Sequence, residues 1–194
     1  MRLEMKKFTF SCFAILITLI LAVSVIGCAQ SETSTTTGPS AAPAVKSATY
    51  TNPELGFSCQ YPAEWDAEEN IMGALVIFAG PMTANDTFMI NISIVTEELS
   101  EAYTIEEYVR LIELQFENSG NDYVKIQGEN IKISGLPAIV QTFTVKVQDF
   151  AIKDKQAYFI KDTTAYVITY DTIEESHDKY TDYFDLVINT FKFE

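Results

Sequence analysis

The chain is poor in the residues that most catalytic and metal sites use. Its 194 residues include one histidine, three cysteines and eight glycines. A serine or cysteine nucleophile needs a base beside it, and transition-metal sites need histidine and cysteine at ligand spacing. No Gly-x-Ser-x-Gly sequence and no glycine-rich phosphate loop is present. The composition therefore predicts a protein that is not an enzyme and has no cofactor and no transition-metal site.

The few reactive side chains stand apart from one another. Cys59 lies in an apolar stretch without a cationic neighbour, which predicts a buried, unreactive thiol. Cys59 is the single cysteine after Cys28 in the sequence, so we expect no disulfide within the domain. His177 lies in an acidic segment between Ser176 and Asp178, and we expect it on the surface rather than acting as a general base.

Basic residues are also scarce. The sequence has 13 Lys and Arg and 27 Asp and Glu, which gives a formal charge of −14. Residues 1–27 carry a net charge of +2, so the chain from Cys28 onward has a charge of about −16. Nucleic acids and anionic lipid surfaces attract Lys and Arg patches. We therefore expect no nucleic-acid partner.

The N-terminus has the organisation of an export signal. Three cations lie within residues 1–7, and residues 8–25 carry no charge. An uncleaved membrane helix is the alternative for a run of this length. The sequence Val25-Ile26-Gly27-Cys28 resembles the lipobox of bacterial lipoproteins. That resemblance implies cleavage after Gly27 and acyl chains, such as palmitate, on Cys28. It predicts a lipid-anchored protein at the extracytoplasmic face of the cell membrane.

Three regions follow from this organisation. Residues 1–27 form the lipoprotein signal peptide, and residues 28–47 form a flexible linker rich in Ser, Thr and Pro. Residues 48–194 contain the periodic apolar patterns of one globular domain. We expect the linker to hold this domain close to the membrane without laying it on the surface.

The domain alternates between strand and helix patterns. Thr104-Ile105-Glu106-Glu107 is a capping box and predicts a helix that Gly120 ends. A second such pattern, Thr172-Ile173-Glu174-Glu175, predicts the start of a last helix whose apolar stripe reaches Phe191. Short apolar runs bounded by turn residues predict strands at 57–61, 75–78, 88–94, 124–126, 131–133, 138–147, 156–160 and 165–170. These patterns predict an α+β fold with a central antiparallel sheet flanked by helices.

Several segments resemble the PsbP/DcrB-like superfamily. They are Tyr50 to Trp65 with its Asn52-Pro53-Glu54-Leu55-Gly56 turn, Gly135-Leu136-Pro137-Ala138, residues 165–170, and Asn189 to Phe193. The resemblance implies an α/β/α sandwich of the PsbP-like type. It implies little about activity, because members of the superfamily serve as extrinsic photosystem subunits, envelope lipoproteins and a nuclear GTPase-release factor.

Two functions remain after these exclusions. The first is a non-catalytic module that binds or stabilises an extracytoplasmic protein. The alternative is a receptor for a small ligand or a divalent cation such as Ca²⁺, in a groove between sheet and helices. Candidate cation-binding carboxylates are Glu97, Glu98 and Glu101, or Asp171 with Glu174 and Glu175. In each group, solvated acidic surface is the simpler interpretation.

Further side chains are candidates for binding or modification. Most aromatic residues fall on the apolar faces of predicted elements, and Tyr103 and Tyr123, at the edges of such elements, are the first candidates for an exposed position. Asn85-Asp86-Thr87 and Asn91-Ile92-Ser93 match the N-glycosylation pattern, and Asn85, in a predicted loop, is the more suitable acceptor. In a bacterial protein these matches are accidental; in an archaeal one Asn85 becomes a candidate.

Overall fold

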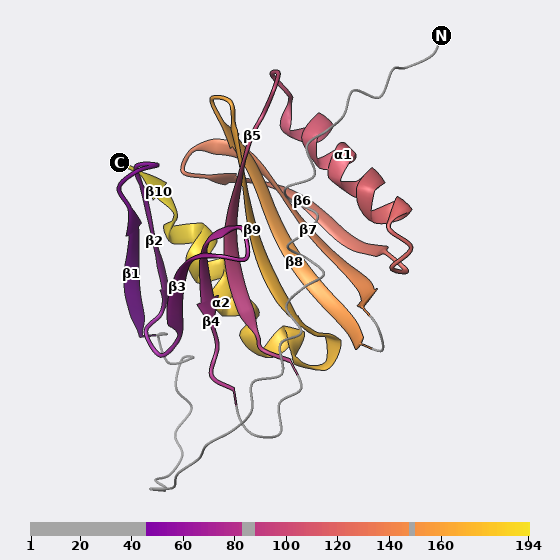
Figure 1. Ribbon diagram of the computed structural model, residues 1–194, viewed down its shortest axis with the longest axis horizontal. Coiled ribbons are helices and arrows are strands. Elements are labelled where there is room, and N and C mark those ends of the chain that lie inside the picture. Colours follow the sequence, from indigo (N-terminus) through magenta and orange to yellow (C-terminus); the bar gives the residue numbers. More distant parts are fainter. Residues whose placement is uncertain (1–45, 83–87, 148–149) are drawn as a thin grey trace, which may run out of the picture.

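A computed structural model describes residues 46–82, 88–147 and 150–194 of the chain. Two antiparallel sheets and two helices account for these residues (Figure 1). The seven-stranded sheet has the order β3-β4-β5-β9-β8-β7-β6, and the three-stranded sheet has the order β1-β2-β10. The elements are β1 (Ser47–Asn52), β2 (Phe57–Pro62), β3 (Asp66–Ile71), β4 (Ala74–Ala79), β5 (Asn91–Glu98), α1 (Ile105–Asn118), β6 (Val124–Ile133), β7 (Leu136–Val147), β8 (Phe150–Lys161), β9 (Thr164–Ile173), α2 (His177–Thr190) and β10 (Lys192–Phe193).

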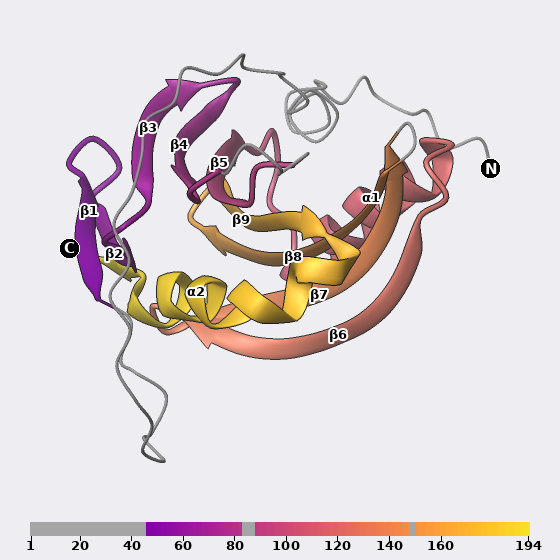
Figure 2. The same cartoon turned by 90° about the horizontal axis from the view of Figure 1, so that it is seen from below.

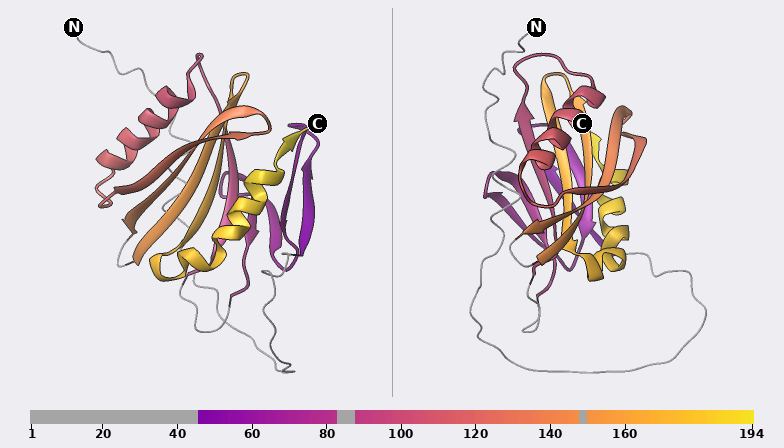
Figure 3. Two further views of the ribbon diagram at one scale, coloured as in Figure 1. Left: turned by 180° about the vertical axis from the view of Figure 1, so that it is seen from behind. Right: turned by 90° about the vertical axis from the view of Figure 1, so that its right-hand side faces the viewer.

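The predicted antiparallel sheet is confirmed, and so is the meander from β6 to β9. Each helix lies on its own face of the large sheet. Figure 3 shows α1 on one side and α2 on the other, with β1 and β2 beyond α2. In residues 46–82, 88–147 and 150–194, each face carries a single helix that covers part of it, so the helical layers are thinner than those of a full α/β/α sandwich. Figure 2 shows the strong curvature of the sheet.

Alternation along the strands divides the core into two parts. On β9, Tyr166, Ile168 and Tyr170 face α2, whereas Ala165 and Val167 face α1. The α2 side holds the larger cluster, in which the rings of Phe57 and Phe191 stack with centroids 4.8 Å apart. That stacking joins the small sheet to the end of α2. Successive residues of a strand point to opposite faces, which explains why these long strands are buried on both sides.

Helix α1 begins where its sequence predicts. Thr104 Oγ1 accepts a hydrogen bond from the Glu107 amide at 3.2 Å, and the Glu107 carboxylate accepts one from the Thr104 amide at 2.9 Å. The face that α1 buries consists of Ile105, Tyr108, Val109, Ile112 and Phe116, the five apolar positions at helical spacing. Both helices have 14 residues, and in the described part of the chain no helix is long and apolar enough to cross a membrane.

Three local predictions are wrong. Thr172 does not cap the last helix, because it lies on β9, is fully buried and pairs with Lys153 of β8. A short 3₁₀ turn at Glu174–Ser176 follows, and α2 begins at His177. The two strands predicted around Gly128 are a single strand, β6. Strand β5 begins at Asn91, later than the apolar alternation from Phe88 suggested.

Candidate functional site

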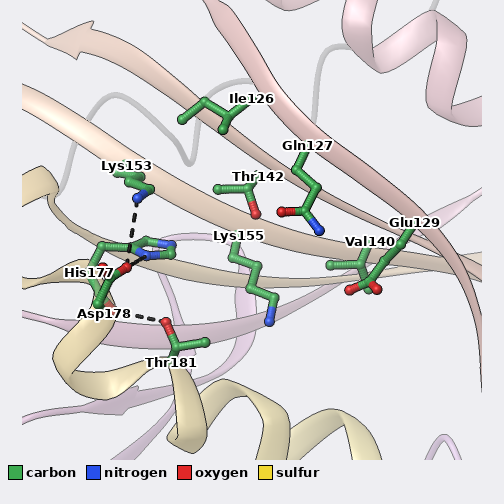
Figure 4. Close-up of a pocket in the computed structure, with 10 residues that line it drawn as sticks. All are labelled: Ile126, Gln127, Glu129, Val140, Thr142, Lys153, Lys155, His177, Asp178 and Thr181. Atoms are coloured by element: carbon green, nitrogen blue, oxygen red, sulfur yellow. Dashed lines mark hydrogen bonds and ion pairs between the residues drawn. The ribbon is translucent and has the colours of Figure 1, made fainter.

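A groove opens between the large sheet and the first turns of α2 (Figure 4). Its cavity volume is about 230 Å³. We call it the β6–α2 groove. Ten residues line it: Ile126, Gln127, Glu129, Val140, Thr142, Lys153, Lys155, His177, Asp178 and Thr181.

Strand register explains how residues distant in sequence form the floor of the groove. Gln127 of β6 pairs with Thr142 of β7, which pairs with Lys155 of β8. Registered neighbours in an antiparallel sheet point to the same face, so these three side chains form one row facing α2. The next row contains Val124 of β6 and Lys153 of β8. The groove is therefore a product of the β6–β7–β8 meander.

Two lysines on the floor hold α2 to the sheet. Lys155 Nζ lies 2.8 Å from the carboxylate of Asp185 and 5.1 Å from the centroid of the Phe184 ring. Lys153 Nζ lies 3.8 Å from the carboxylate of Asp178. Asp178 is almost fully exposed, so its ion pair with Lys153 is screened by water and contributes little stability. The Lys155–Asp185 pair therefore links the middle of α2 to the floor, and the weaker Lys153–Asp178 pair lies at its first turn.

The prediction that His177 is exposed is wrong. The side chain is buried beside the Tyr170 ring, with centroids 5.3 Å apart. Its Nδ1 lies 3.1 Å from the Asp178 carboxylate, and no group among the described residues pairs with its buried Nε2. Burial lowers the pKa of His177, so the imidazole is neutral near pH 7. Because Nε2 is buried, it makes no contact with solvent in the groove.

Around this histidine, the hydroxyl side chains that line the groove are those of Thr142 and Thr181. The ten lining residues include neither serine nor cysteine. The Thr181 hydroxyl donates to the backbone oxygen of His177 at 2.9 Å. The triad arrangement, in which a base receives the proton of a nucleophile, requires that nucleophile at hydrogen-bond distance from the imidazole. The groove has instead the composition of a binding site, with apolar, amide and charged side chains together.

Strand β6, which forms one wall of the groove, is also an edge of the large sheet. Among the strands of the described residues it pairs only with β7, and nearly all of its residues are exposed. Val124 and Ile126 are 57% and 53% exposed, the two highest values among the exposed large apolar side chains of the described residues. Ile126 lies at a register shift between Lys125 and Gln127, which is a β-bulge. An unpaired edge and exposed apolar side chains therefore border the groove.

The opposite edge of the same sheet has a different character. Strand β3 carries Asp66, Glu68 and Glu69, and all three are exposed. Charged side chains on an edge strand prevent another strand from pairing with it. Strand β6 also carries exposed charged side chains, Lys125, Glu129 and Lys132, but it differs from β3 in the two exposed apolar side chains beside the groove.

The other side chains singled out from the sequence have structural roles or lie elsewhere. Cys28 and Asn85 lie outside the described residues. Asn91, of the second glycosylation pattern, is buried on β5. Cys59 is buried as predicted, and burial raises its pKa to about 12. Tyr103 and Tyr123 are only partly exposed; Tyr103 donates to Glu101, and Tyr123 stacks on Phe116 with centroids 5.3 Å apart.

The proposed cation-binding carboxylate groups are not assembled as expected. Glu97 accepts from Tyr108 at 3.0 Å, Glu98 accepts from Thr164 at 2.6 Å, and Glu101 accepts from Tyr103 at 2.9 Å. Asp171 faces the α1 side of β9, where Asp154 of β8 is its registered neighbour. Glu174 and Glu175 lie in the 3₁₀ turn beyond the strand.

Comparisons with known proteins agree on the fold. The model of a family described as PsbP-like protein matches residues 12–193. The solution structure of CyanoP, the cyanobacterial PsbP of Synechocystis sp. PCC 6803, has a TM-score of 0.58 at 18% identity, covering 81% of this chain and 100% of that one. No curated protein sequence matches this chain.

Two further solved structures share the fold at low identity. LpqN of Mycobacterium tuberculosis, described as involved in cell envelope biogenesis, has a TM-score of 0.62 at 10% identity, covering 80% of this chain and 98% of LpqN. The Ran-binding protein Mog1p of Saccharomyces cerevisiae has a TM-score of 0.55 at 9% identity, covering 77% of this chain and 96% of Mog1p. These similarities concern the fold alone.

Proposed function

The chain belongs to the PsbP-like family, and from this premise we propose that it is a lipid-anchored, non-catalytic module that binds another extracytoplasmic protein. Residues 1–27 are removed, Cys28 carries the acyl chains, and residues 28–47 tether the PsbP-like domain of residues 48–194 to the membrane. Two or more acyl chains give a stable anchor, whereas one gives marginal attachment. The name of Mog1p as a Ran-binding protein supports the use of this fold for protein partners.

The observation that carries the proposal is the pairing of an open sheet edge with a groove. Val124 and Ile126 are exposed on β6, and the β6–α2 groove begins directly beside Ile126. An extended segment of a partner adds to such an edge through backbone hydrogen bonds, and its alternate side chains enter neighbouring pockets. Peptide binding by β-strand addition therefore explains the edge and the groove together.

The size of the groove favours a protein partner over a small ligand. Its volume of about 230 Å³ is smaller than the roughly 300–1,000 Å³ typical of small-molecule sites. A cavity of this size accommodates one side chain of a bound segment. The exposed apolar side chains on the rim suit an apolar neighbour in that segment.

The anchor is tested by the mass of the mature N-terminus. We expect the purified protein to begin at an acylated Cys28, and Cys28→Ser to release the domain from washed membranes. A wild-type protein that retains residues 1–27, or a Cys28→Ser variant that remains membrane-bound, contradicts the lipid anchor. Either result leaves the proposal for the β6 edge standing, because that surface is tested separately.

The binding surface is tested by photocrosslinking in cells. A photoreactive amino acid is placed, one position at a time, at Val124, Ile126, Leu114 and Glu68. Leu114 is an exposed apolar residue of α1, and Glu68 lies on the acidic edge β3, so both are matched controls. We expect one crosslinked partner, identified by mass spectrometry, from Val124 and Ile126 and not from the controls. Equal capture from all four positions would contradict a specific site.

A further inference from the structure

Strands β5, β9 and β8 lie side by side in the middle of the large sheet (Figure 1). A row of polar side chains crosses these three strands. Asn91 of β5 pairs with Asp171 of β9, and Asp171 pairs with Asp154 of β8. Registered neighbours lie roughly 4.5–5.5 Å apart between Cβ atoms. Asp171 therefore neighbours both Asn91 and Asp154 on the α1 side of the sheet, opposite the β6–α2 groove.

Three oxygen atoms of this row, two of Asp154 and one of Asn91, lack a hydrogen-bond donor among the described residues. Asp154 and Asn91 are fully buried. No protein group among the described residues donates a hydrogen bond to either carboxylate oxygen of Asp154 or to Oδ1 of Asn91. The Asn91 amide nitrogen is 3.3 Å from the backbone oxygen of Met89. Asn91 donates to the Asp171 carboxylate, and a proton held between Asp154 and Asp171 is the one donor that the row itself can supply to Asp154.

No positive charge compensates the two carboxyl groups. Neither Asp154 nor Asp171 forms an ion pair with a lysine or arginine among the described residues. Burial raises the pKa of Asp154 well above its usual value, and the neighbouring Asp171 raises it further. Burial also raises the pKa of Asp171. Leaving a buried carboxylate without a partner is costly, so the row requires a proton or a cation.

A shared proton satisfies this row only in part. One proton between Asp154 and Asp171 occupies a single oxygen of Asp154 and leaves its second oxygen and the Asn91 oxygen unpaired. A cation contacts several acceptors at once. Carboxylate and amide oxygens are the ligands of hard divalent cations, and Ca²⁺ accepts six to eight oxygens in flexible geometry. Asp171 is only partly buried, which leaves an entry from solvent and room for bound water.

We propose that Asn91, Asp154 and Asp171 form a binding site for a hard divalent cation of the calcium type. The site uses an amide oxygen and two carboxylates from three adjacent strands, and water completes the coordination from the Asp171 side. It is independent of the proposed protein-binding surface, because it lies on the other face of the sheet. Cation binding here would neutralise a buried charge and stabilise the centre of the sheet.

The test uses the whole chain, purified in detergent and stripped of metal with a chelator. CaCl₂ is titrated to about 10 mM while thermal unfolding and binding heat are measured near neutral pH. We expect Ca²⁺ to raise the unfolding temperature of the wild type. Asp154→Asn and Asp171→Asn should weaken Ca²⁺ binding by at least about tenfold. Asp182→Asn, at an exposed position of α2, is the matched control and should behave as the wild type.

A second readout separates loss of the site from loss of the fold. Without Ca²⁺, Asp154→Asn should unfold at a temperature at least as high as the wild type, because the amide has nearly the same shape and needs no proton to lie beside Asp171. A wild type that does not respond to Ca²⁺ would show that the pair holds a proton and would overturn the proposal. An equal Ca²⁺ response in the wild type and Asp154→Asn would place the cation elsewhere. A larger response to Mg²⁺ than to Ca²⁺ would contradict the choice of cation.

Discussion

His177 and Asp178 are in contact, Nδ1 to carboxylate at 3.1 Å, yet their environments are opposite: the His177 side chain is 6% exposed and the Asp178 side chain is 95% exposed. The sheet and Tyr170 bury the imidazole, whereas its acidic partner stays in water. The exposed carboxylate only partly offsets the cost of charging the imidazole, and Lys153 and Lys155, which face the same ring, add to that cost.

The stability of the domain should therefore depend on pH through His177. Its pKa in the folded protein lies below the usual 6.5. A histidine whose pKa is lowered by folding contributes fully to the free energy of unfolding above pH 6.5. That contribution is lost as the pH falls toward the pKa of the folded protein. We expect His177→Gln, which cannot titrate, to differ more from the wild type at pH 8 than at pH 5.5 in urea unfolding. Parallel stability profiles for the two proteins would contradict a buried neutral imidazole.

The two helix starts should respond differently to the same change. Thr104→Ala removes a hydrogen-bonded cap from α1 and should lower the free energy of unfolding by about 1 kcal/mol. Ser176 precedes α2 but makes no side-chain cap bond, so Ser176→Ala should change stability by less than about 0.5 kcal/mol. Denaturant unfolding measures both values. Equal losses in the two variants would show that the cap at Thr104 has no special role.

Cys59 should be chemically inert in the folded protein. Burial raises its pKa to about 12, so almost no thiolate is present at pH 8. We expect iodoacetamide to leave Cys59 unmodified in the native protein and to modify it fully in urea, as measured by intact mass. Rapid modification of the native protein would mean that β2 opens readily or that this side chain is exposed.

The elements that follow from local sequence were predictable. The capping box at Thr104 and the five apolar positions after it define α1. The turn at Asp162-Thr163, which joins β8 and β9 with Lys161 opposite Thr164, also fixes the position of Asp154 opposite Asp171. Counting the same number of residues away from this turn on each strand places Asp154 opposite Asp171, so this acidic pair could be identified from the sequence alone.

Other features depend on tertiary structure. Thr172 has the spacing of a helix cap, but pairing with β8 is available to it only in the folded sheet, and that pairing prevails over the local motif. His177 belongs by spacing to the stripe that continues at Phe184 and Ile188, and this signal could have predicted its burial. The strand order is not readable from local patterns, so the exposed β6 edge and its groove became visible only in the structure.

The central claim is that a protein segment binds along β6 and into the β6–α2 groove. The most direct measurement is the affinity of the crosslinked partner for the purified full chain and for two variants, Ile126→Lys and Leu114→Lys. Both substitutions place a charge at an exposed apolar position, and neither should change the unfolding free energy by more than about 0.5 kcal/mol. We predict that Ile126→Lys weakens binding at least about tenfold and that Leu114→Lys does not. Unchanged affinity in Ile126→Lys, or equal losses in both variants, would contradict the account.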